Sequence, residues 1–130
     1  MRYFLLITLI FLVFRIEASG QEGLLCSEFY RILNTTDNAL LLDVQTKEEY
    51  QKHRIPDNIY AGQKSILLDE VAKVNKKTKI LVYCTEAKRS ASVLKILKKK
   101  GYSNVSHLKG GINKWEEQKF PVDSTKIKMP

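Results

Sequence analysis

Two short apolar runs constrain the fold of this chain more than any other feature of its sequence. Residues 39–42 read ALLL before Asp43, and residues 80–83 read ILVY before Cys84. Neither run alternates apolar and polar residues, as a strand with one exposed face would. Continuous apolar runs of this length are typical of strands buried on both faces of a parallel sheet, and parallel strands need long crossover connections. The two runs therefore predict a sheet with helices between its strands.

The segments around these runs carry the expected helical signals. Thr46 with Glu49 forms a capping box for a short helix, and Gly101 follows the last helical residue of segment 90–100. Further helices are predicted over 27–33 and 65–74 and around Trp115, and further strands over 59–61 and 105–108. Strands that alternate with helices predict an α/β fold with a mostly parallel, doubly wound central sheet and helices on both faces.

The N-terminus has the pattern of a secretory signal peptide. Arg2 precedes an apolar stretch over residues 3–14, and small residues, Ala18 and Gly20, follow. A helix over 3–14 would span only about 18 Å, short of the ~30 Å hydrocarbon core. We predict a signal over 1–20 and a single domain over 21–130, with its core at about 26–122. The protein is then exported, periplasmic or secreted, with no stable membrane insertion after cleavage. An uncleaved signal that tethers the protein is the alternative.

The chain carries a formal net charge of +8. A positive field attracts small anions, although a basic, solvated face that only maintains solubility is the preferred interpretation. No aromatic residues stand between the lysines, so we expect no nucleic-acid partner. His53 and His107 are far from Cys26 and Cys84 in the sequence, so no metal-ligand spacing exists and we expect no metal.

The segment that follows the second apolar run has the features of an active site. Cys84 ends a predicted buried strand, and a helix begins about six residues later. Ligands of open α/β sheets bind at the carboxyl ends of the strands, and the N-terminus of a helix attracts anions. Lys88 and Arg89 add positive charge. This setting favours a thiolate, the nucleophilic form of cysteine, over a buried structural thiol.

From about residue 26 to residue 122 the chain resembles the rhodanese family of sulfurtransferases. Several segments carry the resemblance in their order and spacing: Leu42-Asp43-Val44, Glu49-Tyr50, His53, Ile55-Pro56, Cys84 to Ser90, Gly101-Tyr102, Val105, Leu108 to Gly111, Trp115 and Phe120 to Val122.

The resemblance implies sulfur transfer with no organic cofactor. The Cys84 thiolate would take sulfane sulfur from a donor such as thiosulfate, and a thiophilic acceptor would remove it from the resulting persulfide. The implied partners are small sulfur-containing anions, thiols and a protein sulfur acceptor. The loop residues would hold the persulfide and attract the donor: Thr85, Glu86, Ala87, Lys88 and Arg89. We expect Trp115, a large aromatic side chain, to be a core residue rather than a platform for the substrate.

Three departures from the family pattern bear on the activity. Ala87 and Asp57 stand where glycine is usual, and Gln45 replaces an arginine after Asp43. An alanine at positive φ would cost about 1 kcal/mol. The departures leave a second hypothesis open, in which the protein is a persulfide carrier or binding module with little turnover.

Two further alternatives remain. Related cysteine phosphatases have one more residue between cysteine and arginine, so the four residues before Arg89 favour sulfur over phosphate. Cys26 and Cys84 could instead form a reversible disulfide, if the fold brings their Cα atoms to about 6 Å. His53 is a candidate base, but packing at a helix end is the simpler role, since a thiolate activated by its loop needs no base.

Overall fold

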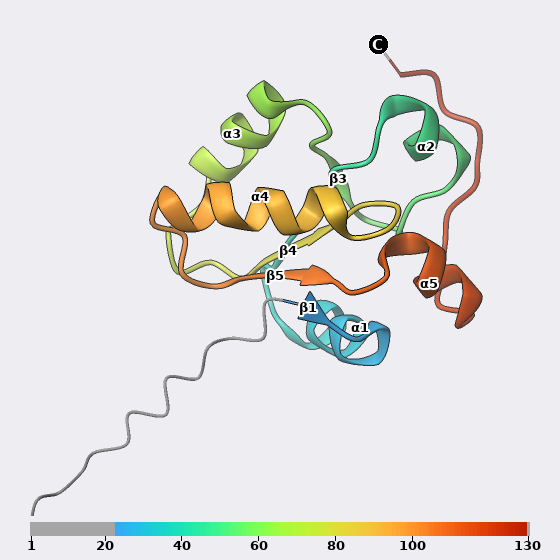
Figure 1. Ribbon diagram of the computed structural model, residues 1–130, viewed down its shortest axis with the longest axis horizontal. Coiled ribbons are helices and arrows are strands. Elements are labelled where there is room, and N and C mark those ends of the chain that lie inside the picture. Colours follow the sequence, from blue (N-terminus) through green and yellow to red (C-terminus); the bar gives the residue numbers. More distant parts are fainter. Residues whose placement is uncertain (1–22, 130) are drawn as a thin grey trace, which may run out of the picture.

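The computed structural model describes residues 23–129, so the predicted signal over 1–20 lies outside the described residues. The sheet is five-stranded, with order β1-β5-β4-β2-β3 and every neighbouring pair parallel. Its strands are β1 Gly23–Leu24, β2 Leu40–Asp43, β3 Ile59–Tyr60, β4 Ile80–Tyr83 and β5 Val105–Leu108. The helices are α1 Cys26–Thr35, α2 Lys47–Lys52, α3 Lys64–Ala72, α4 Lys88–Lys99 and α5 Gly111–Glu117. The predicted α/β fold is confirmed (Figure 1).

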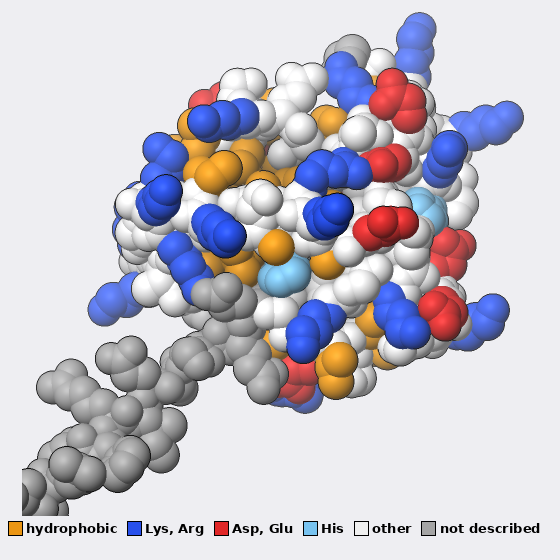
Figure 2. All heavy atoms as spheres, viewed as in Figure 1, with side chains coloured by type: hydrophobic (Ala, Val, Ile, Leu, Met, Phe, Trp, Pro, Cys, Tyr) orange, Lys and Arg blue, Asp and Glu red, His pale blue; other side chains and the backbone are white. Residues whose placement is uncertain are grey.

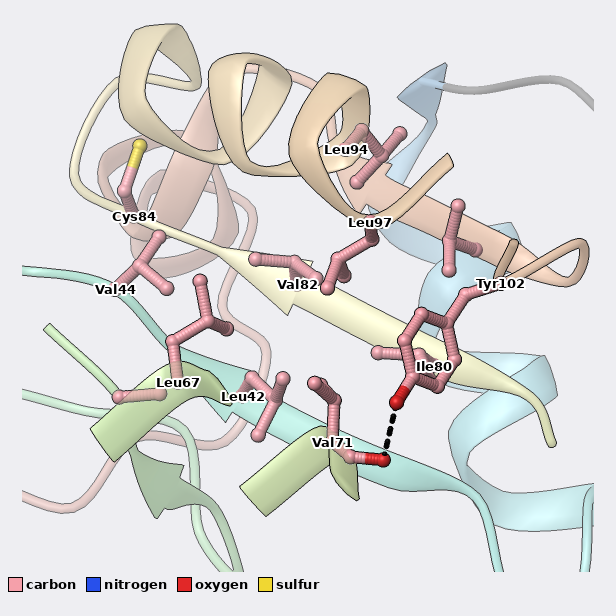
Figure 3. Close-up of a cluster of buried hydrophobic side chains, with 12 residues drawn as sticks. Leu42, Val44, Leu67, Val71, Ile80, Val82, Cys84, Leu94, Leu97 and Tyr102 are labelled. Carbon is pink, nitrogen blue, oxygen red and sulfur yellow. Dashed lines mark hydrogen bonds between the residues drawn. The ribbon is translucent and has the colours of Figure 1, made fainter. Parts of the chain in front are cut away.

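Residues that alternate along β4 fill two separate cores, one on each face of the sheet. Ile80 and Val82 pack with α3 and α4, whereas Leu81 and Tyr83 pack with α1 and α5. All four side chains are fully buried, which explains the continuous apolar run. In the α3/α4 core, the Tyr102 hydroxyl donates a hydrogen bond of 2.7 Å to the carbonyl of Val71 (Figure 3).

The element boundaries differ from the predictions at two informative places. The sequence did not reveal β1, because two residues are too few for a periodic signal. Helix α4 begins at Lys88 rather than at residue 90, so Lys88 and Arg89 belong to its first turn. The loop that follows Cys84 is therefore shorter than predicted.

Glycine is required where α5 meets the loop after β4. A Cβ atom on Gly111 would lie 2.2 Å from the carbonyl oxygen of Thr85 and 2.6 Å from that of Cys84. The close approach lets the amides of Ile112 and Asn113 donate to the same two carbonyls, at 2.9 and 3.3 Å. The start of α5 thus fixes the backbone of the residues that carry the predicted chemistry.

Candidate active site

Cys84 directly follows β4, at the carboxyl edge of the sheet. Its side chain is 1% exposed and belongs to the α3/α4 core. Figure 3 shows the sulfur pointing toward the start of α4. The edge of a parallel sheet is where folds of this class bind ligands, so the position agrees with the sequence prediction.

Hydrogen-bond donors converge on the Cys84 sulfur. The amide of Ala87 donates to Sγ at 3.1 Å, and the amide of Ser90 does so at 3.5 Å. The Ser90 hydroxyl lies 3.6 Å from the same sulfur. Amides aimed at one atom from the first turn of a helix stabilise negative charge there, either on a thiolate or on a group bonded to it.

Ala87 is the N-cap residue of α4 and has φ 83°. The positive φ turns its amide toward Sγ, so the backbone needs the conformation that glycine adopts without strain. Asp57, the second site where glycine is usual, has φ 61°. The chain therefore keeps both backbone conformations and carries their strain on non-glycine residues.

A cavity of about 300 Å³ opens at Cys84. It is lined by Glu49, Cys84, Thr85, Glu86, Lys88 and Arg89. The structure thus brings the predicted residues together around Cys84, and Ala87 contributes its amide to the sulfur. It also adds Glu49, to which the sequence analysis gave only the role of a helix cap. Two carboxylates face two cations around the opening, so its net local charge is near zero.

Arg89 is held by Glu49 and does not face the cavity with an unpaired charge. Its Nη2 lies 2.8 Å from both carboxylate oxygens of Glu49, and its Nη1 donates to the Val44 carbonyl at 3.3 Å. Burial alone would raise the pKa of Glu49, but the Thr46 amide and the hydrogen bonds from Arg89 and Thr85 hold that pKa down at about 2. The carboxylate is therefore charged at neutral pH and competes with any anion for Arg89.

Gln45 connects the loop to a buried carboxyl group. Its Nε2 donates to Asp43 Oδ2 at 2.9 Å, and its Oε1 accepts from the Thr85 hydroxyl at 3.1 Å. Asp43 and Gln45 are fully buried. Burial raises the pKa of Asp43, although hydrogen bonds from Tyr83 and Gln45 oppose the rise. The glutamine thus takes the place of the usual arginine through hydrogen bonds, and no ion pair to Asp43 occurs within residues 23–129.

The two cysteines lie in different cores and cannot form the disulfide considered from the sequence. Cys26 packs on the α1/α5 side of the sheet, whereas Cys84 packs on the α3/α4 side. Both are free thiols, and burial raises the pKa of Cys26. The redox hypothesis that pairs them is therefore wrong, because the sheet separates them.

Other predicted residues lie away from the sulfur. His53 Nδ1 is 2.6 Å from Glu116 Oε2, a hydrogen-bond contact between the end of α2 and α5. Trp115 is fully buried, and its Nε1 donates to the Pro121 carbonyl at 2.8 Å. Trp115 is thus the core residue expected from the sequence. Within residues 23–129, no cluster of His, Cys, Asp or Glu could hold a metal, and no helix is long and apolar enough to cross a membrane.

Sequence reasoning missed Ser90 and His107. Ser90 is fully buried in the first turn of α4, and its hydroxyl lies 3.1 Å from His107 Nδ1. His107 lies on β5 in register with Val82 of β4. The buried hydroxyl so close to Cys84 was a usable signal, but the approach of His107 depends on the strand order, which the sequence does not reveal.

A model of the family described as the rhodanese-like domain matches residues 25–118. The chain belongs to the rhodanese-like family. The match covers every residue of the cavity and both faces of the sheet. The prediction of a rhodanese-like, sulfurtransferase-type chain is thereby confirmed.

Relatives with related names cover much of the chain. A sulfurtransferase of Allochromatium vinosum is 29% identical over 69% of this chain and 83% of its own. The thiosulfate sulfurtransferase GlpE of Pseudomonas savastanoi is 31% identical over 59% of this chain and 72% of its own. A putative sulfur carrier protein of Bacillus subtilis, YrkF, is 29% identical over 76% of this chain and 53% of its own. The match spans only 22% of the yeast adenylyltransferase and sulfurtransferase relatives.

Solved structures share the fold. A rhodanese-related protein from Thermoplasma volcanium superimposes with a TM-score of 0.67 at 24% identity, covering 80% of this chain and 99% of its own. At this identity the likeness concerns the fold alone.

Proposed function

We propose that the protein transfers sulfane sulfur through a persulfide on Cys84. One observation carries the proposal: the amides of Ala87 and Ser90 converge on a sulfur that lies at an open cavity. These donors would stabilise first the attacking thiolate and then the persulfide. The family to which the chain belongs and its sulfurtransferase relatives support the same chemistry.

With thiosulfate as donor, the reaction has two balanced steps. The Cys84 thiolate attacks the sulfane sulfur, an S–S bond forms at Sγ, and the bond to the sulfonate sulfur breaks. Sulfite leaves with that electron pair. An acceptor such as cyanide then bonds to the terminal sulfur, and Cys84 departs again as the thiolate. Lys88 is the cavity cation that remains to attract the donor while Glu49 occupies Arg89.

The second candidate is a persulfide carrier that loads sulfur but releases it only to a partner protein. The ion pair between Arg89 and Glu49 favours it, because a paired guanidinium attracts an anionic donor weakly. A relative described as a putative sulfur carrier also supports it. In this case the acceptor would be a protein thiol.

One experiment separates the two candidates. The protein is incubated with thiosulfate, with and without cyanide, and both thiocyanate and the mass of Cys84 are measured. Steady thiocyanate production supports the enzyme, whereas a sulfur adduct of about 32 Da on Cys84 without turnover supports the carrier. Cys84→Ser must abolish both signals, and Cys26→Ser, the matched change on the other face of the sheet, must preserve them. A Cys84→Ser variant that still forms the adduct would exclude both proposals.

We further propose that the protein is exported and that residues 1–20 are removed. The charged start, apolar stretch and small exit residues support this. The intact mass of protein recovered from the culture medium or periplasm tests it. A mature chain that begins at about residue 21 supports export, and a full-length chain in the cytoplasm contradicts it.

A further inference from the structure

Ser90 places an imidazole within two hydrogen bonds of the Cys84 sulfur. The Ser90 hydroxyl lies 3.6 Å from Cys84 Sγ and 3.1 Å from His107 Nδ1. It also lies 3.1 Å from the Ala87 carbonyl, to which it can donate. The serine is fully buried, so its hydroxyl forms hydrogen bonds with these three partners and not with bulk water.

The three residues come from three elements that the fold holds rigidly. Cys84 ends β4, Ser90 belongs to the first turn of α4, and His107 lies on β5, the neighbour of β4 in the sheet. His107 is paired in register with Val82, two residues before Cys84, so both side chains rise from the same face. The contact is thus a consequence of the sheet register and does not depend on a mobile loop.

We propose that His107 and Ser90 form a proton relay that sets the ionisation of Cys84. This inference rests on the proposed role of Cys84 as nucleophile, and it assigns His107 as a positioning residue that acts through Ser90. In the forward direction, the Sγ–H proton passes to Ser90 Oγ while the Ser90 proton passes to His107 Nδ1. The products are a thiolate and an imidazolium, so charge and protons balance without any other reactant.

The donor pattern of each state is consistent with the contacts. Before transfer, the thiol donates to Ser90, and Ser90 donates to a neutral Nδ1. After transfer, the imidazolium donates to Ser90, and Ser90 donates to the thiolate, which also receives the amides of Ala87 and Ser90. A cysteine paired with a histidine in this way reacts faster near neutral pH than an isolated thiol does.

The residues that pair with His107 in the sheet are uncharged. β1 contributes Gly23 and β4 contributes Val82 in register, neither of which is charged, and α4 contributes Ser90. A Cβ atom on Gly23 would lie 2.9 Å from Lys109 Cγ and 3.3 Å from His107 Nε2, so the side chains of Lys109 and His107 both approach this glycine. A cation near the ring would oppose the imidazolium form, so the transfer depends on the stabilisation of the thiolate by the amides of Ala87 and Ser90.

The test is the pH profile of Cys84 alkylation by iodoacetamide, which reacts with the thiolate. Rates are measured from pH 4.5 to 9.5 by peptide mass, so that Cys26 is counted separately. In His107→Asn, which keeps a polar atom near Ser90 but cannot hold the proton, we expect the midpoint to rise by about one pH unit. The rate at pH 6.5 then falls about ten-fold, whereas the plateau rate at pH 9.5 stays the same.

Two further variants make the result decisive. Ser90→Ala should shift the midpoint as His107→Asn does, and the double variant should shift it no further, because the relay needs both residues. His53→Asn, which alters the other histidine at its contact with Glu116, should leave the profile unchanged. Thermal unfolding of each variant identifies any that is not folded.

Every outcome of these alkylation measurements either supports or overturns the proposed relay. A merely structural role would lower the plateau or the thermal stability without moving the midpoint, and midpoints that stay in place in folded variants overturn the proposal. Additive shifts in the double variant also overturn it, since they show independent effects. Alkylation does not require sulfur transfer, so absence of the sulfur adduct in thiosulfate would disprove the proposed function and leave this measurement intact.

Discussion

Ala87 concentrates the strain of the active loop in one residue. Its φ of 83° lies in the region that disfavours a Cβ atom, yet that conformation aims its amide at the Cys84 sulfur. The family pattern drew attention to residue 87, because it has glycine there and this chain has alanine. The alanine is strained only if the backbone keeps the positive φ that glycine allows. The structure shows that the backbone is retained.

Ala87→Gly should stabilise the protein by about 0.5–1 kcal/mol, because the relief of strain exceeds the entropy that glycine adds to the unfolded chain. Denaturant unfolding measures the change. Ala91→Gly is the matched control, since it makes the same substitution inside α4, where alanine is favourable, and should destabilise the protein by about 1 kcal/mol. Equal signs in the two variants would contradict the strain assigned to Ala87.

At the scale of elements, Glu49 ties α2 to the active loop. Its carboxylate accepts the Thr46 amide at 2.9 Å as part of the capping box and contacts Arg89 in the first turn of α4. The capping box was predicted from the sequence, because its residues are three apart. The contact with Arg89 could not be predicted, because it joins residues that lie forty positions apart in the sequence.

The same limit explains which parts of the fold were predictable. The apolar runs of β2 and β4, the capping box and the glycine after α4 are local signals, and the structure has all of them. Other features depend on contacts between segments that are distant in the sequence. They are the two-residue strand β1, the start of α4 at Lys88 and the contact between Ser90 and His107. Local patterns therefore located the nucleophile but not the residues that surround it.

Glu49→Gln should lower stability most at neutral pH. The pKa of Glu49 falls from its ordinary 4.5 to about 2 in the folded protein, so the stabilisation is full above pH 4.5 and is lost as the pH falls toward 2. Because the pair is partly exposed, we expect a loss of about 0.5–1 kcal/mol at pH 7. Melting curves of both proteins should converge between pH 4.5 and 2, and a constant difference over that range would contradict the assignment.

The same substitution should speed the reaction with thiosulfate. Without the carboxylate, Arg89 is available to the anion, and a charge of this kind is worth about 1 kcal/mol at 4 Å in water. We expect the second-order rate of adduct formation on Cys84 to rise about three- to ten-fold. Uncharged iodoacetamide serves as the control and should react at an unchanged rate at pH 9.5. A thiosulfate rate that does not rise would show that Glu49 leaves Arg89 accessible.

At the scale of the whole molecule, the charge of the chain and the charge of the cavity differ. The chain carries +8, and α4 bears five basic residues and no acidic one. Figure 2 shows basic side chains spread across the face on which α4 lies, whereas acidic side chains gather toward one end. The cavity itself pairs Glu49 and Glu86 with Lys88 and Arg89. Besides Lys88, attraction of an anion must therefore come from lysines distant from Cys84.

Lysines distant from Cys84 attract thiosulfate only when salt does not screen their charge. Helix α4 is about 18 Å long, so its final lysines lie within the ~30 Å Debye length at 0.01 M salt but beyond the ~8 Å length at 0.15 M. The thiosulfate rate should therefore fall about two- to five-fold between these concentrations. Lys98→Gln with Lys99→Gln should remove most of this dependence, since both side chains lie at the far end of α4 from Cys84. A salt dependence that survives in that variant would place the attraction at Lys88 and Arg89 instead.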